Sequence, residues 1–255
     1  MEKTILWEKE NGIGIISLNR PEKMNALTRE LLQELSAVLE TAEKDASIKV
    51  VILTGRGKGF CAGGDLEGHP AFSDNDPLKR EGYIREAQKC TLQLTRLSKP
   101  VIAAINGAAA GAGLDLALAC DIRIVADDAA FAEVFVRAGG MPDMGGTYFL
   151  PRLLGIGKAM ELILTGDRID AREAWRIGLV NQVVPSSEVM VQAKALGTRL
   201  AGGSSEAYRF IKWAVYRGLG QSLEDALENE IHGQSRLLGT EFMQGFARNF
   251  SKKKE

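Results

Sequence analysis

The chain has 255 residues, of which 45% are hydrophobic, and this is enough to bury the core of one large domain. Its 32 lysines and arginines almost balance its 33 acidic residues, for a formal net charge of −1. Such a balance excludes a general basic field that would attract nucleic acid or an anionic membrane. We therefore expect no nucleic-acid partner, and any anionic ligand must be held by local groups.

The cysteine and histidine content argues against several kinds of site. Cys61, Cys90 and Cys120 are odd in number and widely spaced, which is not typical of a disulfide framework or a zinc site and fits a reducing cytoplasm. The two histidines, His69 and His232, fall in a polar loop and in a predicted surface helix, so neither is a good candidate for the histidine of a Ser-His-Asp triad. We expect a cytoplasmic protein without a metal site.

One stretch, residues 101–120, is apolar enough to suggest a membrane span. Asn106, Asp115 and three glycines interrupt it, however, which favours a segment buried inside a folded domain. The start of the chain also has no long apolar signal region. We expect no membrane association.

In chain order, the first part alternates strands, helices and glycine-rich loops. Apolar runs predict strands at residues 5–7, 13–18, 50–53, 101–105 and 121–125, with a hairpin around Asn11-Gly12. Helical spacing of apolar residues predicts a helix capped by Thr28 and another over 83–97. This alternation indicates an α/β fold with crossover connections and a largely parallel, buried sheet.

From Gly155 onward the pattern changes to helices. A helix is predicted at residues 158–164, Asp170 begins a capping-box pattern, and Gly178 is a typical helix stop. Later helices are expected to begin near Glu188, Ser204 and Ser222. We therefore divide the chain near Leu154 into a core, residues 1–154, and a helical region, residues 155–255.

Two predicted strands are followed by loops rich in glycine and alanine, at residues 57–68 and 106–113. Glycine lets backbone N–H groups approach a ligand closely. The first loop approximates a dinucleotide fingerprint only weakly, and neither loop contains a phosphate-loop motif. N–H groups from both loops that converge on one oxygen would form an oxyanion hole. The alternative is that both loops are tight turns between packed elements.

Four motifs occur in order: Phe60-Cys-Ala-Gly-Gly-Asp-Leu66, Pro100-Val-Ile-Ala-Ala-Ile-Asn-Gly107, Ala110-Gly-Ala-Gly-Leu-Asp-Leu116 and Leu164-Thr-Gly-Asp-Arg168. With them the chain resembles the crotonase, or enoyl-CoA hydratase/isomerase, superfamily over nearly its whole length. The resemblance implies a spiral of ββα units with a C-terminal helical trimerisation region. It also implies acyl-coenzyme A substrates of the kind met in fatty acid metabolism, no cofactor beyond the coenzyme A of the substrate, and a homotrimer or a dimer of trimers.

The same motifs assign the oxyanion hole by resemblance. They place its two N–H donors at Gly64 and Ala112. Family members often have glycine at the second position, but alanine still supplies an N–H, so we expect the site to be retained.

The acid groups of the hydratases are only partly present. Family hydratases use two glutamates, and the corresponding positions here are Asp115 and Phe135, a departure that puts simple hydration in doubt. Glu133 lies nearby and, in an extended segment, would share a face with position 135. Asp115 has the alternative role of an acid in the first turn of its helix.

Asp143, directly after Pro142, is the strongest candidate for a catalytic acid or base. Resembling isomerases carry an acid at this position, and the dehalogenase branch has a nucleophilic aspartate there. We expect an apolar pocket, lined by Phe135 and Phe149, to raise the pKa of Asp143 so that it moves a proton between two carbons. The alternative is an ordinary Pro-Asp turn.

The resemblance also suggests residues that hold the coenzyme. It implies contacts at Lys23, Ala26, Ala62, Asp65 and Leu66. A basic residue near the C-terminus of a neighbouring subunit would meet the phosphates, and Arg248 or Lys252 is available. The alternative is that these cations only solubilise the surface.

We therefore favour an enoyl-CoA isomerase that shifts a double bond through a thioester enolate. One alternative is an enoyl-CoA hydratase that uses Asp115 with Glu133. A hydrolase or dehalogenase with Asp143 as nucleophile is another, weakened by the lack of a helper histidine. A non-catalytic scaffold that binds acyl-CoA or RNA is the alternative from a different class.

Overall fold

The computed structural model describes residues 3–67 and 75–252. His69 and the beginning of the polar stretch after Gly68 lie outside the described residues, so the predictions made for them are not taken further.

A six-stranded sheet forms the centre of the chain. Its strand order is β1 (Ile5–Glu10), β2 (Ile13–Leu18), β3 (Val50–Gly55), β5 (Val101–Ile105), β7 (Ile122–Ala126) and β10 (Gln182–Val184). β1 and β2 form the predicted hairpin, and all other pairs are parallel. Every residue of β2, β3 and β5 is buried, as expected for parallel strands covered on both faces. The predicted parallel sheet is confirmed.

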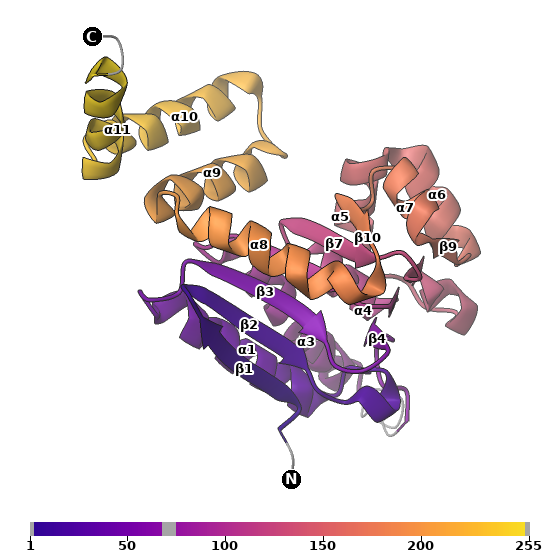
Figure 1. Ribbon diagram of the computed structural model, residues 1–255. Coiled ribbons are helices and arrows are strands. Elements are labelled where there is room, and N and C mark those ends of the chain that lie inside the picture. Colours follow the sequence, from indigo (N-terminus) through magenta and orange to yellow (C-terminus); the bar gives the residue numbers. More distant parts are fainter. Residues whose placement is uncertain (1–2, 68–74, 253–255) are drawn as a thin grey trace.

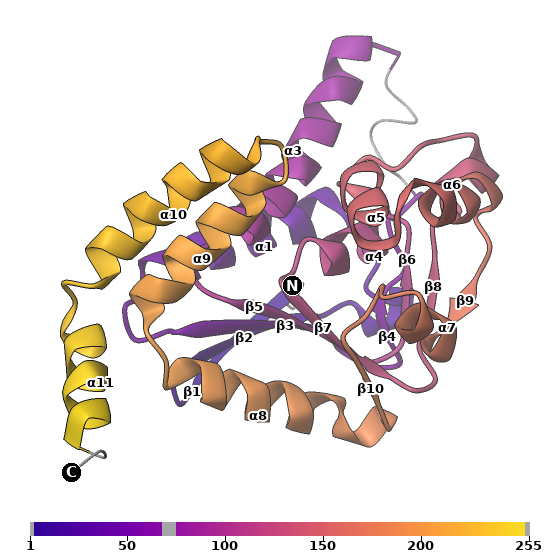
Figure 2. The same ribbon diagram turned by 90° about the horizontal axis from the view of Figure 1, so that it is seen from above.

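Helices cover both faces of this sheet. α1 (Arg29–Lys44) and α3 (Pro77–Arg96) lie on one face, and α8 (Val189–Ala201) lies on the other (Figure 2). The hydroxyl of Thr28 caps α1 by accepting the Leu31 N–H at 3.2 Å, as its sequence position predicts. The apolar stripe of α1 is buried, because it faces the sheet and α3.

A second, smaller sheet was missed by the sequence analysis. It consists of β4 (Gly59–Cys61), β6 (Ala108–Ala110), β8 (Ala130–Ala132) and β9 (Ile169–Asp170). The first two strands occupy part of the segments predicted to be loops. Strands of only two or three residues show too little alternation to be recognised from sequence.

The two sheets are linked by three consecutive units, each with a long strand, a short strand and a helix. These units are β3–β4–α3, β5–β6–α4 (Ala112–Leu118) and β7–β8–α5 (Gly146–Leu154), the last with the 3-10 helix η2 (Val134–Ala138) inserted before its helix. The long strands are neighbours in one sheet and the short strands are neighbours in the other. This is the predicted arrangement of ββα units.

The predicted boundary near Leu154 does not separate two bodies. After α6 (Ile156–Thr165), β9 pairs with β8, and after α7 (Ala171–Arg176), β10 pairs with β7. The segment up to the end of α8, which follows the short helix η3 (Ser186–Glu188), therefore completes both sheets. The region 155–255 is consequently not wholly helical.

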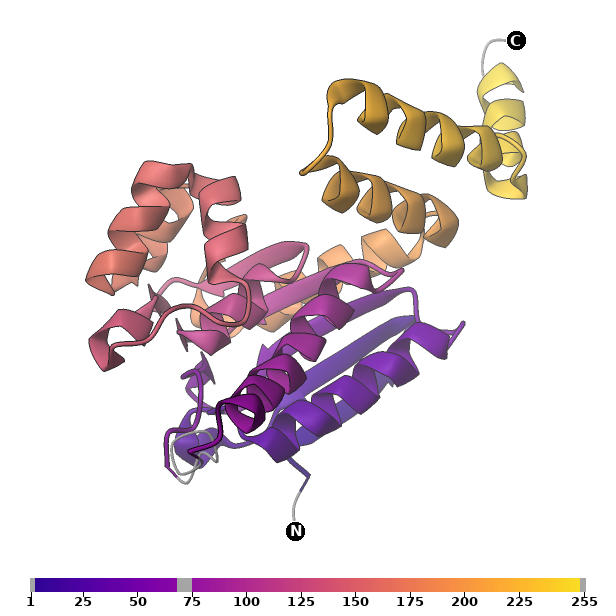
Figure 3. The same ribbon diagram turned by 180° about the vertical axis from the view of Figure 1, so that it is seen from behind.

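The helices that do stand apart are α9 (Ser205–Gly218), α10 (Leu223–Leu237) and α11 (Glu241–Lys252), which extend away from the sheets (Figures 1 and 3). Ser204 and Ser222 cap α9 and α10, as predicted. Large apolar side chains are more than half exposed along these helices: Ile211, Val215, Leu223, Ile231, Leu238, Phe242 and Phe246.

One buried contact joins these C-terminal helices to the core. Lys212 on α9 donates to the Asp121 carboxylate and the Leu94 carbonyl, each at 2.8 Å. The other oxygen of that carboxylate accepts the Tyr216 hydroxyl at 3.2 Å. The pair fixes α9 against the start of β7.

None of the helices in the described part of the chain is both long and apolar enough to cross a membrane. The apolar stretch 101–120 forms β5, β6 and α4, all packed in the core.

Candidate active site

The two glycine-rich loops leave the small sheet side by side. β4 and β6 are adjacent and parallel, so the loops that follow them emerge at the same edge. A Cβ on Gly63 would lie 2.8 Å from the Ala110 carbonyl oxygen and 3.6 Å from the Ala112 nitrogen. The backbone around Gly64 and the first turn of α4 are therefore in direct proximity, a closeness that only glycine at position 63, with φ of +98°, permits.

Two backbone N–H groups remain available at this edge. In the described residues, no protein atom accepts a hydrogen bond from the N–H of Gly64 or of Ala112. Their neighbours are bonded: the Gly111 N–H donates to Ala132 at 2.9 Å, and the Asp65 N–H donates to Leu27 at 2.9 Å. The two N–H groups predicted to form the oxyanion hole are thus not used by the protein itself.

A buried asparagine fixes the first loop. The side-chain nitrogen of Asn25 donates to the carbonyls of Arg56, Gly59 and Phe60 at 2.9 to 3.1 Å, and its oxygen accepts the Arg20 N–H at 2.9 Å. Asn25 lies between Lys23 and Ala26, two residues predicted to contact the coenzyme, but its own side chain is fully buried and structural. Its left-handed backbone, with φ of 56°, is a conformation that asparagine tolerates better than most residues.

The other residues predicted to contact the coenzyme surround the loop. Ala62 and Leu66 are exposed, whereas Ala26 is buried. Lys23 forms an exposed ion pair with Glu67 at 2.5 Å, and Asp65 pairs with Arg20 at 2.9 Å. These residues border the exposed edge of Gly64, and Asp65 is engaged in holding the loop.

Asp115 and Glu133 form a buried pair of carboxyl groups. The two residues are 0% and 1% exposed, and both carboxyl groups approach Gly146, where a Cβ would lie 2.5 Å from Asp115 Oδ1 and 3.2 Å from Glu133 Oε1. Asp115 Oδ2 accepts the Met144 N–H at 3.1 Å, whereas Asp115 Oδ1 and both oxygens of Glu133 have no hydrogen-bond partner among the described residues. Burial raises the pKa of both groups, and the raised pKa of Glu133 is further increased by the adjacent Asp115.

Glu133 reaches this position in a different way from the one predicted. The segment is not extended, because Glu133 caps the short helix η2, which contains Phe135. Side chains two residues apart do not share a face in such a helix. Glu133 consequently points inward to Asp115, while the ring of Phe135 lies close to Gly111, with ring atoms 3.5 Å and 3.7 Å from the position of a Cβ there.

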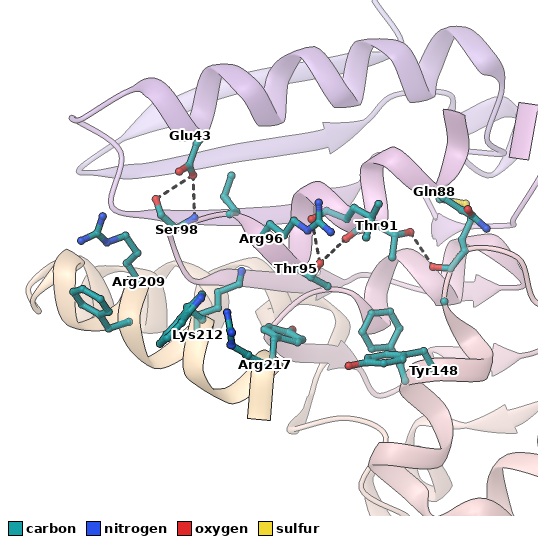
Figure 4. A pocket seen from close by; sticks show the side chains of 18 of the residues that line it. Glu43, Gln88, Thr91, Thr95, Arg96, Ser98, Tyr148, Arg209, Lys212 and Arg217 are labelled. Carbon is teal, nitrogen blue, oxygen red and sulfur yellow. Dashed lines mark hydrogen bonds between the residues drawn. The ribbon is translucent and has the colours of Figure 1, made fainter. Parts of the chain in front are cut away.

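Asp143 lies in the turn that precedes α5 and lines a large cavity. The cavity has a volume of about 1030 Å³ and lies between α3, α5 and the helices α9 and α10 (Figure 4). Phe149 lines it together with Asp143, as predicted, but Phe135 does not. Asp143 is half-buried, so it reaches the cavity, whereas Asp115 and Glu133 are sealed beneath it.

Two residues of α3 that the sequence analysis missed hold this turn. Gln88 donates to the Asp143 carbonyl and Thr91 to the Met144 carbonyl, each at 2.8 Å. Both residues line the side of the cavity that α3 forms (Figure 4). Tyr148 lies at the end of the cavity that α5 forms (Figure 4). Two polar residues three positions apart inside an apolar helical stripe are a signal of this kind of contact.

Arg248 and Lys252 both lie on α11, at the end of the C-terminal helices and far from β4 and α4 in one chain (Figures 1 and 2). Arg248 is exposed. Within one subunit neither residue lies at the glycine loops (Figure 1), so the predicted contact with the coenzyme requires a neighbouring subunit, and the alternative of solubilising surface charge stays open.

The described residues contain no group of three or more histidine, cysteine, aspartate or glutamate side chains arranged to hold a metal ion. Cys61, beside the first loop, is fully buried, and burial raises the pKa of its thiol to about 12. It is therefore a poor nucleophile.

Comparisons with known proteins agree with this geometry. The family model described as enoyl-CoA hydratase/isomerase matches residues 8–254. A probable enoyl-CoA hydratase from Rhodobacter capsulatus is 42% identical over 91% of this chain and 89% of its own length. A short-chain-enoyl-CoA hydratase from Clostridium acetobutylicum is 38% identical over 90% of this chain and 88% of its own length.

A solved structure shows the same fold. The crystal structure of an enoyl-CoA hydratase from Bacillus anthracis matches with a TM-score of 0.92 and 35% identity, over 98% of this chain and 96% of that chain. The fold of this chain is therefore shared with a protein of that name. The chain belongs to the enoyl-CoA hydratase/isomerase family, and so to the crotonase superfamily of acyl-CoA-processing enzymes.

Proposed function

We propose that the protein is an enoyl-CoA isomerase that moves a double bond of an acyl thioester by proton transfer through Asp143. The observation that carries the proposal is the difference in access among three carboxyl groups. Asp143 lines the cavity, whereas Asp115 and Glu133 are fully buried and both packed against Gly146. Hydration needs a water molecule held between two acids, and this buried pair leaves no exposed surface for one.

In the proposed reaction the thioester oxygen accepts hydrogen bonds from the N–H groups of Gly64 and Ala112. The Asp143 carboxylate removes a proton from the γ carbon of a 2-enoyl thioester or the α carbon of a 3-enoyl thioester. The electron pair of the broken C–H bond passes into the conjugated system, and negative charge develops on the thioester oxygen. Asp143 then returns the proton to the other carbon. Each oxyanion donor contributes about 3 kcal/mol to stabilising that charge.

The test uses one absorbance, that of the conjugated 2-enoyl thioester. An isomerase supplied with a 3-enoyl-CoA produces this absorbance, whereas a hydratase supplied with crotonyl-CoA removes it. We expect Asp143→Asn to lower the rate of isomerisation at least 100-fold. The matched control is Asp167→Asn, because Asp167 is exposed and paired only loosely with Arg137, at 3.6 Å. Full isomerase turnover by the Asp143→Asn protein would rule out this mechanism.

Hydration of a 2-enoyl-CoA is the second candidate. It is favoured by the names of the relatives and by the presence of two acids, Asp115, one turn beyond Ala112 on α4, and Glu133, at the start of η2. For this reaction Glu133→Gln would abolish turnover, whereas the isomerase needs only the carboxylate of Asp143. The non-catalytic alternative gains no support from relatives that are named as enzymes.

The assembly and the coenzyme site are part of the same proposal. A trimer would cover the exposed apolar side chains of α9, α10 and α11. More than half of the surface of Leu223 and of Phe246 is exposed to solvent in one subunit and could be buried in such an interface. In such a trimer Arg248 or Lys252 of one subunit would meet the coenzyme phosphates of another, near Lys23, Ala62 and Leu66. Mass measurement of the native protein tests the trimer directly.

A further inference from the structure

We propose that Asp115 and Glu133 form a carboxyl pair that holds one proton, and that its single negative charge, carried by Asp115, raises the proton affinity of Asp143. Both are positioning residues in this account, because they act on the substrate only through Asp143. The proposal deepens the isomerase assignment, and only its kinetic part rests on that assignment.

The geometry places the pair directly beneath the turn that carries Asp143. Asp115 accepts the N–H of Met144, the residue next to Asp143, at 3.1 Å. A Cβ on Gly146 would lie 2.5 Å from Asp115 Oδ1 and 3.2 Å from Glu133 Oε1, so both carboxyl groups are packed against the first residue of α5. Glycine is required at position 146 for this close approach.

The hydrogen bonds determine which member carries the charge. Asp115 accepts the backbone N–H of Met144 at 3.1 Å, and this favours its anionic form. Neither oxygen of Glu133 has a hydrogen-bond partner in the described part of the chain, so nothing stabilises a charge there. The buried Glu133 is therefore the neutral member, and Asp115 is the anion.

The charge on Asp115 acts on Asp143 through a low-dielectric interior. The influence is mutual, because the charge of Asp143 also raises the pKa of Asp115 and of Glu133. From α3, the neighbours of the turn are the uncharged Gln88 and Thr91.

The cavity in front of Asp143 adds charged and titratable groups from α1, α3, α5, α9 and α10. These are Glu43, Arg96, Tyr148, Arg209, Lys212, Tyr216, Arg217, His232 and Arg236. The variants below leave all of them unchanged. A difference between variants therefore reports the pair alone.

The test compares wild type with Asp115→Asn, Glu133→Gln and the double variant. The side chain of Asn retains an oxygen to accept the Met144 N–H, and that of Gln retains a neutral donor toward Asp115. The titration of Asp143 is followed by isotope-edited infrared spectroscopy of labelled aspartate, with Asp143→Asn for assignment. The pH dependence of kcat/KM is measured with a 3-enoyl-CoA, and circular dichroism checks that each variant is folded.

We expect Asp115→Asn and the double variant to shift the Asp143 titration, and the acid limb of the rate profile, to lower pH by about one unit or more. Glu133→Gln is the matched control and should leave both unchanged, because it replaces one neutral group by another. An unchanged titration in Asp115→Asn would overturn the proposal, and so would an equal shift in Glu133→Gln, because that would place the charge on Glu133.

The two proposals fail in different ways. If Asp115→Asn shifts the Asp143 titration but the wild-type protein does not isomerise 3-enoyl-CoA, the charge pair is supported and the isomerase assignment is refuted. An active isomerase whose Asp143 titrates identically in all variants would support the function and refute the pair. A shifted Asp143 titration in Glu133→Gln would overturn the proposal by itself, even if Asp115→Asn does not fold.

Discussion

Replacing Lys212 by methionine is expected to destabilise the protein by about 3 kcal/mol. Its ammonium group is 8% exposed as a side chain and donates to the Asp121 carboxylate and to the Leu94 carbonyl, each at 2.8 Å. Methionine has a similar length but leaves the carboxylate without its cation. Removal of one partner of a buried ion pair costs about 3 to 5 kcal/mol.

The lower end of that range applies because Asp121 keeps other contacts. Its carboxylate still accepts the Val101 N–H at 2.7 Å and the Tyr216 hydroxyl at 3.2 Å, and its side chain is 20% exposed. Water and these two donors together replace part of the lost interaction.

The control is Lys194→Met. Lys194 pairs with Glu10 at 2.6 Å, a similar distance, but the two side chains are 39% and 48% exposed. Exposed pairs contribute about 0 to 1 kcal/mol, so this variant should lose about 0.5 kcal/mol. The free energy of unfolding is measured by urea titration of all three proteins at one protein concentration. Equal losses in the two variants would show that burial of the Lys212 pair is not what stabilises α9.

Three further results are expected. Gly146→Ala should lower turnover at least 10-fold and stability by about 1 to 3 kcal/mol, because its Cβ would lie 2.5 Å from Asp115 Oδ1. The control is Gly157→Ala, whose Cβ would have no atom within 4 Å, so this variant should be neutral or slightly stabilising. Identical behaviour of the two variants would refute the steric argument. Asn25→Ala should cost about 2 to 4 kcal/mol in thermal or urea unfolding, because one donor and three carbonyls lose their partner; a loss below about 1 kcal/mol would mean that water replaces the side chain. The pKa of Glu133 is raised on folding, so above its ordinary pKa the native state keeps a proton that the unfolded chain releases. The free energy of unfolding therefore falls as pH rises, by at most about 1.4 kcal/mol per pH unit. Glu133→Gln should remove this slope between pH 5 and 8, as measured by urea unfolding.

Much of the large sheet could be predicted from the sequence because each strand is a long apolar run. Val50–Gly55 and Val101–Ile105 are buried along their whole length, and such strands have a clear signature. Helix starts with a side-chain cap, such as Thr28 and Asp170, were also predictable, because the cap depends on residues only three positions apart. Local chemistry determines both features.

The small sheet and the acid pair depend on long-range contacts, which local patterns do not contain. Gly59–Cys61 is a strand only because Ala108–Ala110 lies beside it. Asp115 and Glu133 were both selected as candidates, but their mutual burial follows from the turn of η2, which the sequence did not reveal. The role of Asn25 was missed for the same reason, since its partners lie more than 30 residues away.

The pairing of β4 with β6 has a consequence for how such an enzyme changes its chemistry. The paired strands and the Asn25 side chain fix the loops that carry the Gly64 and Ala112 N–H groups, and none of these contacts involves the side chain of an acid at position 115, 133 or 143. In the proposed enzyme, single substitutions at those three places would exchange one proton-transfer reaction for another without moving the two N–H groups. The groups proposed to bind the thioester are thus positioned separately from the acids proposed to select the reaction, so that few substitutions would be needed for divergence.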